Sequence, residues 1–232
     1  MILQVGLENN YENRSLAWAL DYPRCFSYGA DRAEALIRLP QAFVAHKEWV
    51  ARHQQPSWLD SVKDFDVRLV EAWTVYSIGE DYELKEDGYE VNAWFRHDWK
   101  PLTGAEIQQD LAMLAWSRAD LLELVQPLSD EILDRRYEGE RWSIRGILAH
   151  IANAEQWYLH RLGLTNLTHN QLPANVWERL EVVRRLLKDI LPGLEGSQQV
   201  VGIDGEFWSP RKLARRSLWH EFDHIQHIQK LL

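Results

Sequence analysis

Short apolar runs separated by polar stretches make up most of the first hundred residues. The runs at residues 3–7 and 16–20 flank the polar stretch 8–14, which predicts two strands joined by a hairpin loop. Two further β-rich runs, at 67–78 and 89–99, enclose an acidic stretch and predict a second hairpin. This part of the chain is therefore predicted to contain a sheet.

A helical pattern lies between the two predicted hairpins. Asp31 precedes Glu34 by three residues, an arrangement that is typical of a helix N-terminus. Pro40 falls inside the pattern and is expected to kink or split the helix, because proline removes a backbone hydrogen bond. The apolar positions at helical spacing are Ala35, Leu36, Leu39, Phe43 and Val44.

After Pro101 the apolar spacing changes to that of helices. Thr103 with Glu106 forms a capping box, Ser143 begins a second helix, and residues 174–191 form a third that Pro192 and Gly193 end. Ser209 caps the last helix, and Pro210 suits its first position because that backbone N–H has no helical partner.

Together these patterns predict an α+β fold in two parts. Residues 1–100 are expected to form a mixed α/β domain, and residues 103–232 a four-helix bundle with at least one long crossover. A long strand after residue 104 would contradict this division.

Three histidines stand on apolar stripes of the predicted bundle. His220 and His224 are four residues apart and therefore share one face of the last helix. His150 shares a stripe with Ile147 and Ile151 on the helix that begins at Ser143. Two facing helices can thus present three imidazoles to one point and leave a coordination position open, as catalytic metal sites do. The alternative is a set of core histidines, each hydrogen-bonded to its own partner.

The remaining histidines are weaker candidates for metal ligands. His227 either orients another side chain or lies near the helix C-terminus because the helix dipole favours it there. Surface or loop positions are predicted for His46, His53, His97, His160 and His169.

Other polar residues have two interpretations each. A buried structural role for Cys25 is favoured over a reactive thiol beside Arg24. Glu155 and Glu221 can serve as acid/base groups, although salt-bridged or solvated carboxylates are favoured. The sequence assigns no catalytic residue. A solvated face is favoured over an anion site for the basic cluster of Arg211, Lys212, Arg215 and Arg216.

Composition and charge exclude several classes of protein. The 232 residues are 46% hydrophobic and 26% charged, values typical of a globular protein, and the net charge of −9 argues against specific DNA binding. One cysteine excludes a disulfide framework and a multi-cysteine zinc site. Neither a signal peptide nor a membrane-spanning run is present, so a cytoplasmic protein without membrane contact is expected.

The C-terminal part resembles the DinB/YfiT-like superfamily. The resemblance covers about residues 103–232 and is carried by WSIRGILAHIANAE at 142–155 and HEFDH at 220–224. It implies a four-helix bundle in which His150, His220 and His224 hold a divalent metal ion, often Zn, Ni or Fe. A glutamine is common in that superfamily at the position of His227. Members include thiol-dependent transferases and isomerases.

The N-terminal part is similar to HicB-type antitoxins over about residues 1–55. The stretch AWALDYPRCFSYGAD at 17–31, followed by Glu34-Ala35-Leu36, carries this likeness, although Arg24 stands where that family usually has glycine. The DNA-binding module of that family is absent here, so an antitoxin role does not follow from the likeness.

The leading hypothesis is a DinB-like metal-dependent enzyme that acts on a small molecule, as a thiol-dependent transferase or a hydrolase, through the three-histidine site. The alternative is a non-catalytic metal-binding protein whose HicB-like domain docks a protein partner. A homodimer stays open under either hypothesis.

Overall fold

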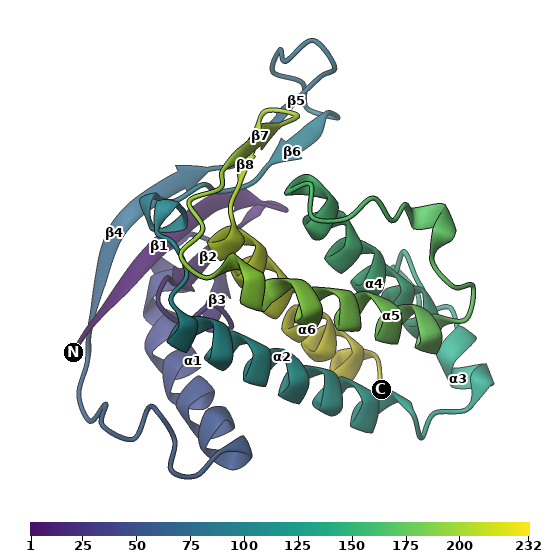
Figure 1. Ribbon diagram of the computed structural model, residues 1–232, viewed down its shortest axis with the longest axis horizontal. Helices are drawn as coiled ribbons and strands as arrows, with labels where there is room; N and C mark the ends of the chain where they lie inside the picture. The colour runs from purple at the N-terminus through teal and green to yellow at the C-terminus, as the bar shows by residue number, and fades with distance from the viewer. The chain divides into compact units, whose positions relative to one another are not determined.

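The computed structural model describes residues 1–232 and divides into two compact units. The N-terminal unit comprises Met1–Lys100 and Val200–Lys212, and the bundle unit comprises Pro101–Gln199 and Leu213–Leu232. The predicted α+β class is confirmed, since sheets and helices are both present (Figure 1). The sequence did not indicate that residues 200–212 pack with the first hundred. None of the helices contains a stretch long and apolar enough to cross a membrane.

A four-stranded sheet forms the core of the N-terminal unit. Its order is β3-β2-β1-β4, with β4 parallel to β1 and the other pairs antiparallel. The apolar face carries Leu3, Val5 and Leu7, which pack with Leu39 and Phe43 of helix α1. The strands are β1 (Ile2–Tyr11), β2 (Arg14–Ala19), β3 (Phe26–Gly29) and β4 (Asp66–Thr74), and the helix is α1 (Arg32–His53).

The first hairpin is tighter than predicted. The polar stretch 8–14 was expected to be a loop, but β1 continues to Tyr11, so only Glu12 and Asn13 separate the two strands. Glu8 explains why a polar residue continues the strand: its carboxylate is buried and accepts hydrogen bonds from Trp18 Nε1 at 3.0 Å and from the Ala93 backbone N–H at 2.7 Å. A carboxylate that accepts a hydrogen bond on each oxygen is compatible with burial.

Helix α1 begins where the sequence predicts and continues farther than expected. The Asp31 side chain accepts a hydrogen bond from the Glu34 backbone N–H, which confirms the N-cap. Of the two effects expected of Pro40, the split is wrong, because α1 is continuous from Arg32 to His53. Leu39 and Phe43 on either side are fully buried, and their packing offsets the lost backbone hydrogen bond.

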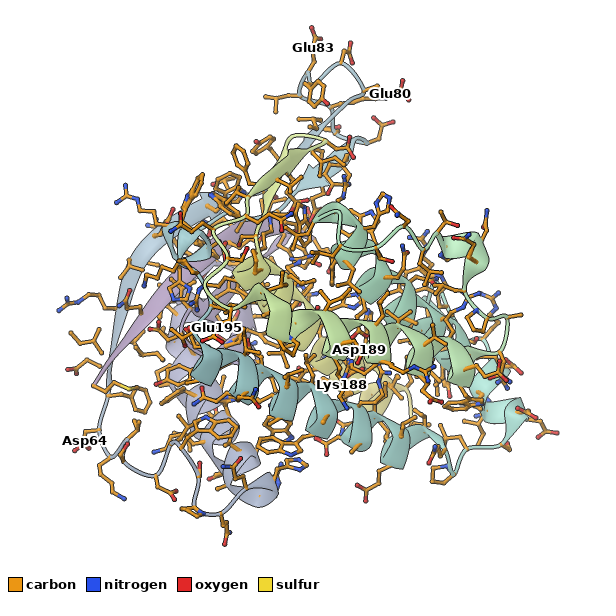
Figure 2. The ribbon with its side chains drawn as sticks, viewed as in Figure 1. Asp64, Glu80, Glu83, Lys188, Asp189 and Glu195 are labelled. Atoms are coloured by element: carbon orange, nitrogen blue, oxygen red, sulfur yellow. The ribbon has the colours of Figure 1, made fainter.

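The second predicted hairpin is only partly correct. The run 67–78 divides, because β4 pairs with β1 whereas β5 (Tyr76–Ile78) pairs with β6 (Tyr89–Val91). After Val91 the expected strand gives way to a 3₁₀ turn, η1 (Arg96–Trp99), because Asp98 Oδ2 accepts the Phe95 backbone N–H. Glu80 and Glu83 lie at the tip of the loop between β5 and β6 (Figure 2).

The helices of the bundle unit confirm the predicted helix starts. Thr103 and Glu106 form a capping box, and Ser143 accepts a hydrogen bond from the Gly146 backbone N–H. The two strands after residue 104 form one short hairpin. The helical elements after residue 103 are α2 (Gly104–Val125), α3 (Asp130–Asp134), α4 (Ile144–Arg161), η2 (His169–Gln171), α5 (Val176–Ile190), η3 (Leu191–Leu194) and α6 (Pro210–Leu231). The hairpin strands are β7 (Val201–Ile203) and β8 (Glu206–Trp208), which belong to the N-terminal unit.

The basic cluster near the start of α6 does not form the predicted solvated face. All four side chains are buried, and Lys212, which is fully inaccessible, donates to Glu206 Oε1 at 2.6 Å and to the Phe207 carbonyl at 3.0 Å. Helical spacing alone did not show that acceptors are supplied by the hairpin β7–β8. The buried members are Arg211, Lys212, Arg215 and Arg216.

Two histidines predicted to lie at the surface are buried. His97 is held by Asp21, whose Oδ1 lies 3.0 Å from His97 Nε2, and the histidine lowers the pKa of that carboxyl. His46 lies on the buried face of α1. In contrast, His160 and His169 are exposed, as predicted.

Candidate metal centre

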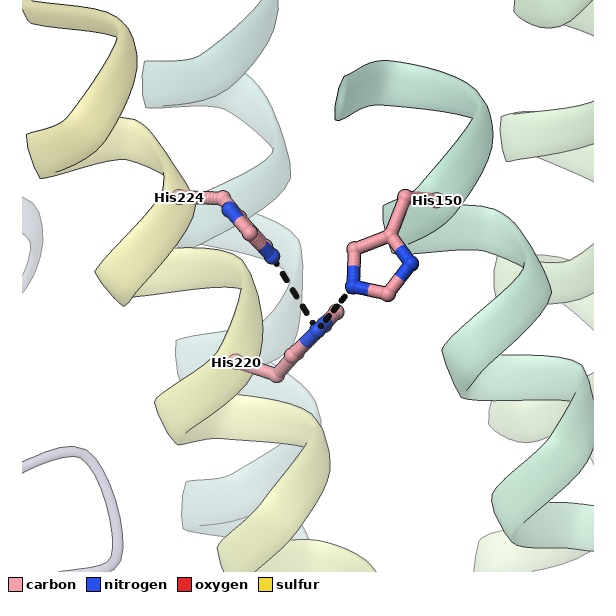
Figure 3. A group of neighbouring side chains, drawn as sticks. All are labelled: His150, His220 and His224. Atoms are coloured by element: carbon pink, nitrogen blue, oxygen red, sulfur yellow. Dashed lines mark hydrogen bonds between the residues drawn. The ribbon is translucent and has the colours of Figure 1, made fainter. Parts of the chain in front are cut away.

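Two helices of the bundle unit supply the three candidate histidines. His150 lies on α4, one residue before the buried Ile151, and His220 and His224 lie one turn apart on α6. Because residues four apart on a helix lie one above the other, both α6 rings extend toward α4 (Figure 3). The structure therefore brings together the three residues that the sequence singled out.

The three rings meet through their Nε2 atoms. His220 Nε2 lies 3.1 Å from His150 Nε2 and 3.1 Å from His224 Nε2 (Figure 3). The ligand atoms of all three residues lie within 4.8 Å of one another, and no fourth His, Cys, Asp or Glu side chain joins the group. His220 is buried, whereas His150 and His224 are half-buried, so the cluster is not sealed from solvent.

Burial keeps these imidazoles neutral. Desolvation is the largest cause that lowers the pKa of each ring, and it lowers the pKa of His224 to about 3. Neighbouring charges act in the same direction: Arg141 on His150, and Arg216 together with the other two rings on His220. A neutral imidazole has a free nitrogen lone pair, which is the form that binds a metal ion.

Hydrogen bonding alone does not account for this arrangement. A neutral imidazole has one donor and one acceptor nitrogen, and each ring nitrogen has a single in-plane site. His220 Nε2 nevertheless has two Nε2 neighbours at hydrogen-bond distance, and His224 Nδ1 is buried without a partner. Nitrogen ligands at ~2.0–2.1 Å from a tetrahedral ion lie roughly 3.3 Å apart, close to the spacing seen here. The residues present therefore fit a divalent ion.

Trp142 and His227 border the cluster, and the sequence had not indicated the position of Trp142. Trp142 stacks on His150, with ring centroids 4.5 Å apart and an interplanar angle of 24°. His227 Nε2 lies 2.9 Å from Glu140 Oε2, so its outer nitrogen is engaged with a carboxylate. The sequence offers no signal for Glu140, because it lies on a loop.

The carboxylates considered as acid/base groups are buried in salt bridges. Glu155 and Glu221 contact Arg118 and Arg184, which the sequence analysis missed. Spacing could have indicated both arginines: Arg118 follows Leu114 by four residues, and Arg184 follows Leu180 by four, so each falls on a buried helical stripe. Cys25 is buried, as favoured, and desolvation raises the pKa of its thiol to about 12.

Fold and site together define a helical bundle with a three-histidine cluster between two of its helices. Residues 113–228, half of the chain, match the family model of the DinB superfamily, and the chain belongs to that superfamily. Among solved structures, it is similar to YfiT from Bacillus subtilis, described as a probable metal-dependent hydrolase with an unusual four-helix bundle topology. That likeness has 19% identity and a TM-score of 0.44, and it covers 56% of this chain and 87% of that one. No curated protein matches the chain significantly.

Proposed function

We propose that this protein is a metal-dependent enzyme in which His150, His220 and His224 hold a divalent ion, with Zn, Ni and Fe as candidates. The observation that carries the proposal is the convergence of three neutral imidazoles. His220 Nε2 lies 3.1 Å from the Nε2 atom of each of the other two rings. A bound ion supplies Lewis acidity and lowers the pKa of a bound water or thiol, which favours hydrolysis or thiol-dependent transfer on a small molecule.

The surrounding side chains favour an open site over a closed structural one. Structural zinc sites complete four protein ligands, whereas catalytic sites keep a position for water or substrate. The group contains three protein ligands, and the nearby His227 has its Nε2 engaged with Glu140. Trp142 covers one face of His150 and presents an apolar wall beside the cluster, which suits a small organic substrate.

Metal analysis of the purified protein tests the ligand assignment. We expect stoichiometric divalent metal in the wild type and its loss in His150→Ala, His220→Ala and His224→Ala. His160→Ala is the matched control, since this exposed histidine lies on the same helix as His150. Retention of metal in all three cluster variants would refute the assignment.

A second measurement separates an enzyme from a non-catalytic metal-binding protein. The visible spectrum of the cobalt-loaded protein should shift when a small thiol or azide is added, because an open coordination position accepts such a ligand. An unchanged spectrum indicates a closed site. It would favour the alternative, in which the N-terminal unit, with its predicted HicB-like character, docks a protein partner.

A further inference from the structure

Four of the buried charged residues of the bundle unit contact one another, and one lies on each of its four long helices. Arg118 is on α2, Glu155 on α4, Arg184 on α5 and Glu221 on α6. All four are nine-tenths buried or more, and two positive and two negative charges cancel. We call this set the Arg–Glu tetrad.

Each arginine of the tetrad contacts both carboxylates. Arg118 Nε lies 2.7 Å from Glu221 Oε2, and its Nη2 lies 3.2 Å from Glu155 Oε2. Arg184 Nε lies 2.6 Å from Glu155 Oε1, and its Nη2 lies 3.0 Å from Glu221 Oε2. The two helices that carry glutamates are therefore joined twice, through side chains of the other two helices.

The same arginines also brace the helices from which they come. Arg118 Nη1 on α2 donates to the Leu180 carbonyl on α5 at 2.6 Å, and Arg184 Nη1 on α5 donates to the Leu114 carbonyl on α2. These bonds are reciprocal and use the planar guanidinium fork, which fixes direction as well as distance. The tetrad thus restrains both the spacing and the axial register of all four helices.

Stability alone does not explain why this core is charged. Removing ions from water costs more than most buried pairs return, and well-packed apolar residues of similar volume often stabilise a core equally or better. The bundle unit fills its core with apolar side chains elsewhere, such as Leu121, Ile147, Ile151 and Val183. What a tetrad provides beyond apolar packing is a unique arrangement of the helices.

The glutamates lie on the two helices that carry the metal-site histidines. Glu221 directly follows His220 on α6, and Glu155 lies five residues after His150 on α4. A shift of α4 along α6 would change the separation between His150 and His220, whose Nε2 atoms now lie 3.1 Å apart. We propose that the Arg–Glu tetrad is a positioning device that sets α4 against α6, so that the three imidazoles meet at ligand spacing. This inference rests on the proposed metal site.

An apolar replacement of the tetrad tests this role. We expect the variant R118M/E155L/R184M/E221L to fold and unfold cooperatively, because all four charges are removed together and none is left unpaired. Its zinc affinity should fall roughly 10–100-fold, the effect typical of losing supports around metal ligands. The absorption spectrum of bound cobalt should also change. Wild-type affinity and spectrum in this variant would overturn the proposal.

A conservative variant keeps the test valid if the apolar one fails to fold. Arg184→Lys preserves the charge but replaces the fork by a single point donor, which cannot hold both carboxylates and the Leu114 carbonyl together. Its zinc affinity should fall as well, and an unchanged affinity overturns the proposal. Arg145→Met is the matched control on α4, because it removes an exposed ion pair with Asp130 and Asp134. It should bind zinc as the wild type does.

The test also distinguishes a failure of the positioning role from a failure of the proposed metal site. If the wild type binds no zinc, the proposed function fails, and crystal structures of the metal-free proteins decide on the tetrad. The separation of His150 and His220 Nε2 should stay near 3.1 Å in the wild type and widen beyond hydrogen-bond distance in Arg184→Lys. Equal separations in both would overturn the positioning role.

Discussion

The two units of this protein both bury histidine, with different consequences. In the N-terminal unit, His46 is surrounded by aromatic rings, with Tyr22, Phe43 and Trp49 centroids at 6.1, 6.4 and 6.2 Å. In the bundle unit, three histidines meet one another. Desolvation is the largest cause that lowers the pKa of His46 and of His224, each to about 3. A lowered pKa therefore reports burial in both units, whereas the convergence of ligand atoms is confined to the candidate metal centre.

Buried charge shows a related contrast between the units. Lys212 pairs with Glu206, which also accepts a hydrogen bond from the Tyr89 hydroxyl, and the ammonium lies 4.8 Å from the Trp208 ring centroid. Lys212 is thus a single buried cation whose acceptors lie on strand β8, a few residues earlier in the chain. The Arg–Glu tetrad instead joins four helices. In one unit the buried charge is hydrogen-bonded by residues nearby in sequence, and in the other it is hydrogen-bonded across helices. We therefore expect mutations in the two units to have different effects.

The largest effect is expected at the buried lysine. Lys212→Met leaves the Glu206 carboxylate buried without its cation, and breaking such a pair costs about 3–5 kcal/mol in the free energy of unfolding. Chemical denaturation measures this loss. Metal stoichiometry of the folded variant should not change, because Lys212 is eight residues away from His220. Loss of metal in a folded Lys212→Met protein would show that the two networks are not independent.

Metal addition should stabilise the protein through the cluster and not through His46. Zinc at about a hundredfold above its dissociation constant adds about 2.7 kcal/mol to the free energy of unfolding. Thermal unfolding with and without zinc measures this effect as a rise in Tm. His220→Leu should abolish the rise and His46→Leu should preserve it. A rise that survives His220→Leu would place the metal elsewhere.

Much of the helical structure could be predicted because its signals are local. The cap side chains of Asp31, Thr103 and Ser143 accept hydrogen bonds from backbone N–H groups three residues away. The i, i+4 spacing of His220 and His224 follows from helix geometry. Signals within one turn of helix do not depend on the rest of the fold. The starts of these helices were therefore predicted correctly.

The errors concern residues whose partners are distant in sequence. Glu8 continues a strand because Trp18 and Ala93 satisfy its carboxylate, and the Ala93 contact spans 85 residues. Lys212 was predicted to be solvated because its hairpin acceptors were not apparent from helical spacing. Arg118 and Arg184 were missed for the same reason. A charged residue on an apolar stripe thus indicates burial with a polar partner, but the stripe does not identify that partner.

Acidification should weaken the metal-free protein in both units. The folded pKa of His46 and of His224 is about 3, below the value of about 6.5 for an unfolded histidine. The unfolded chain therefore binds protons first, and stability present above pH ~6.5 is lost as the pH falls toward about 3. Each such histidine contributes up to about 1.4 kcal/mol per pH unit within that window.

Variants assign this pH dependence to the two units. His46→Leu and His224→Leu should each reduce the slope of unfolding free energy against pH, as measured by denaturant titrations of the metal-free protein. The reductions should be additive, because the two histidines lie in separate units. A slope that neither variant changes would mean that other groups control the acid response.

The smallest effect is expected at His227, which borders the cluster without joining it. Its Nε2 is engaged with Glu140, and both side chains are 31% exposed, so the contact is partly screened by solvent. His227→Gln can still donate to Glu140 and should change zinc affinity by less than about tenfold, or 1.4 kcal/mol. His224→Gln, one turn earlier, is the comparison and should lose stoichiometric metal. Equal loss in both variants would make His227 a ligand and close the position that the proposed enzyme needs for its substrate.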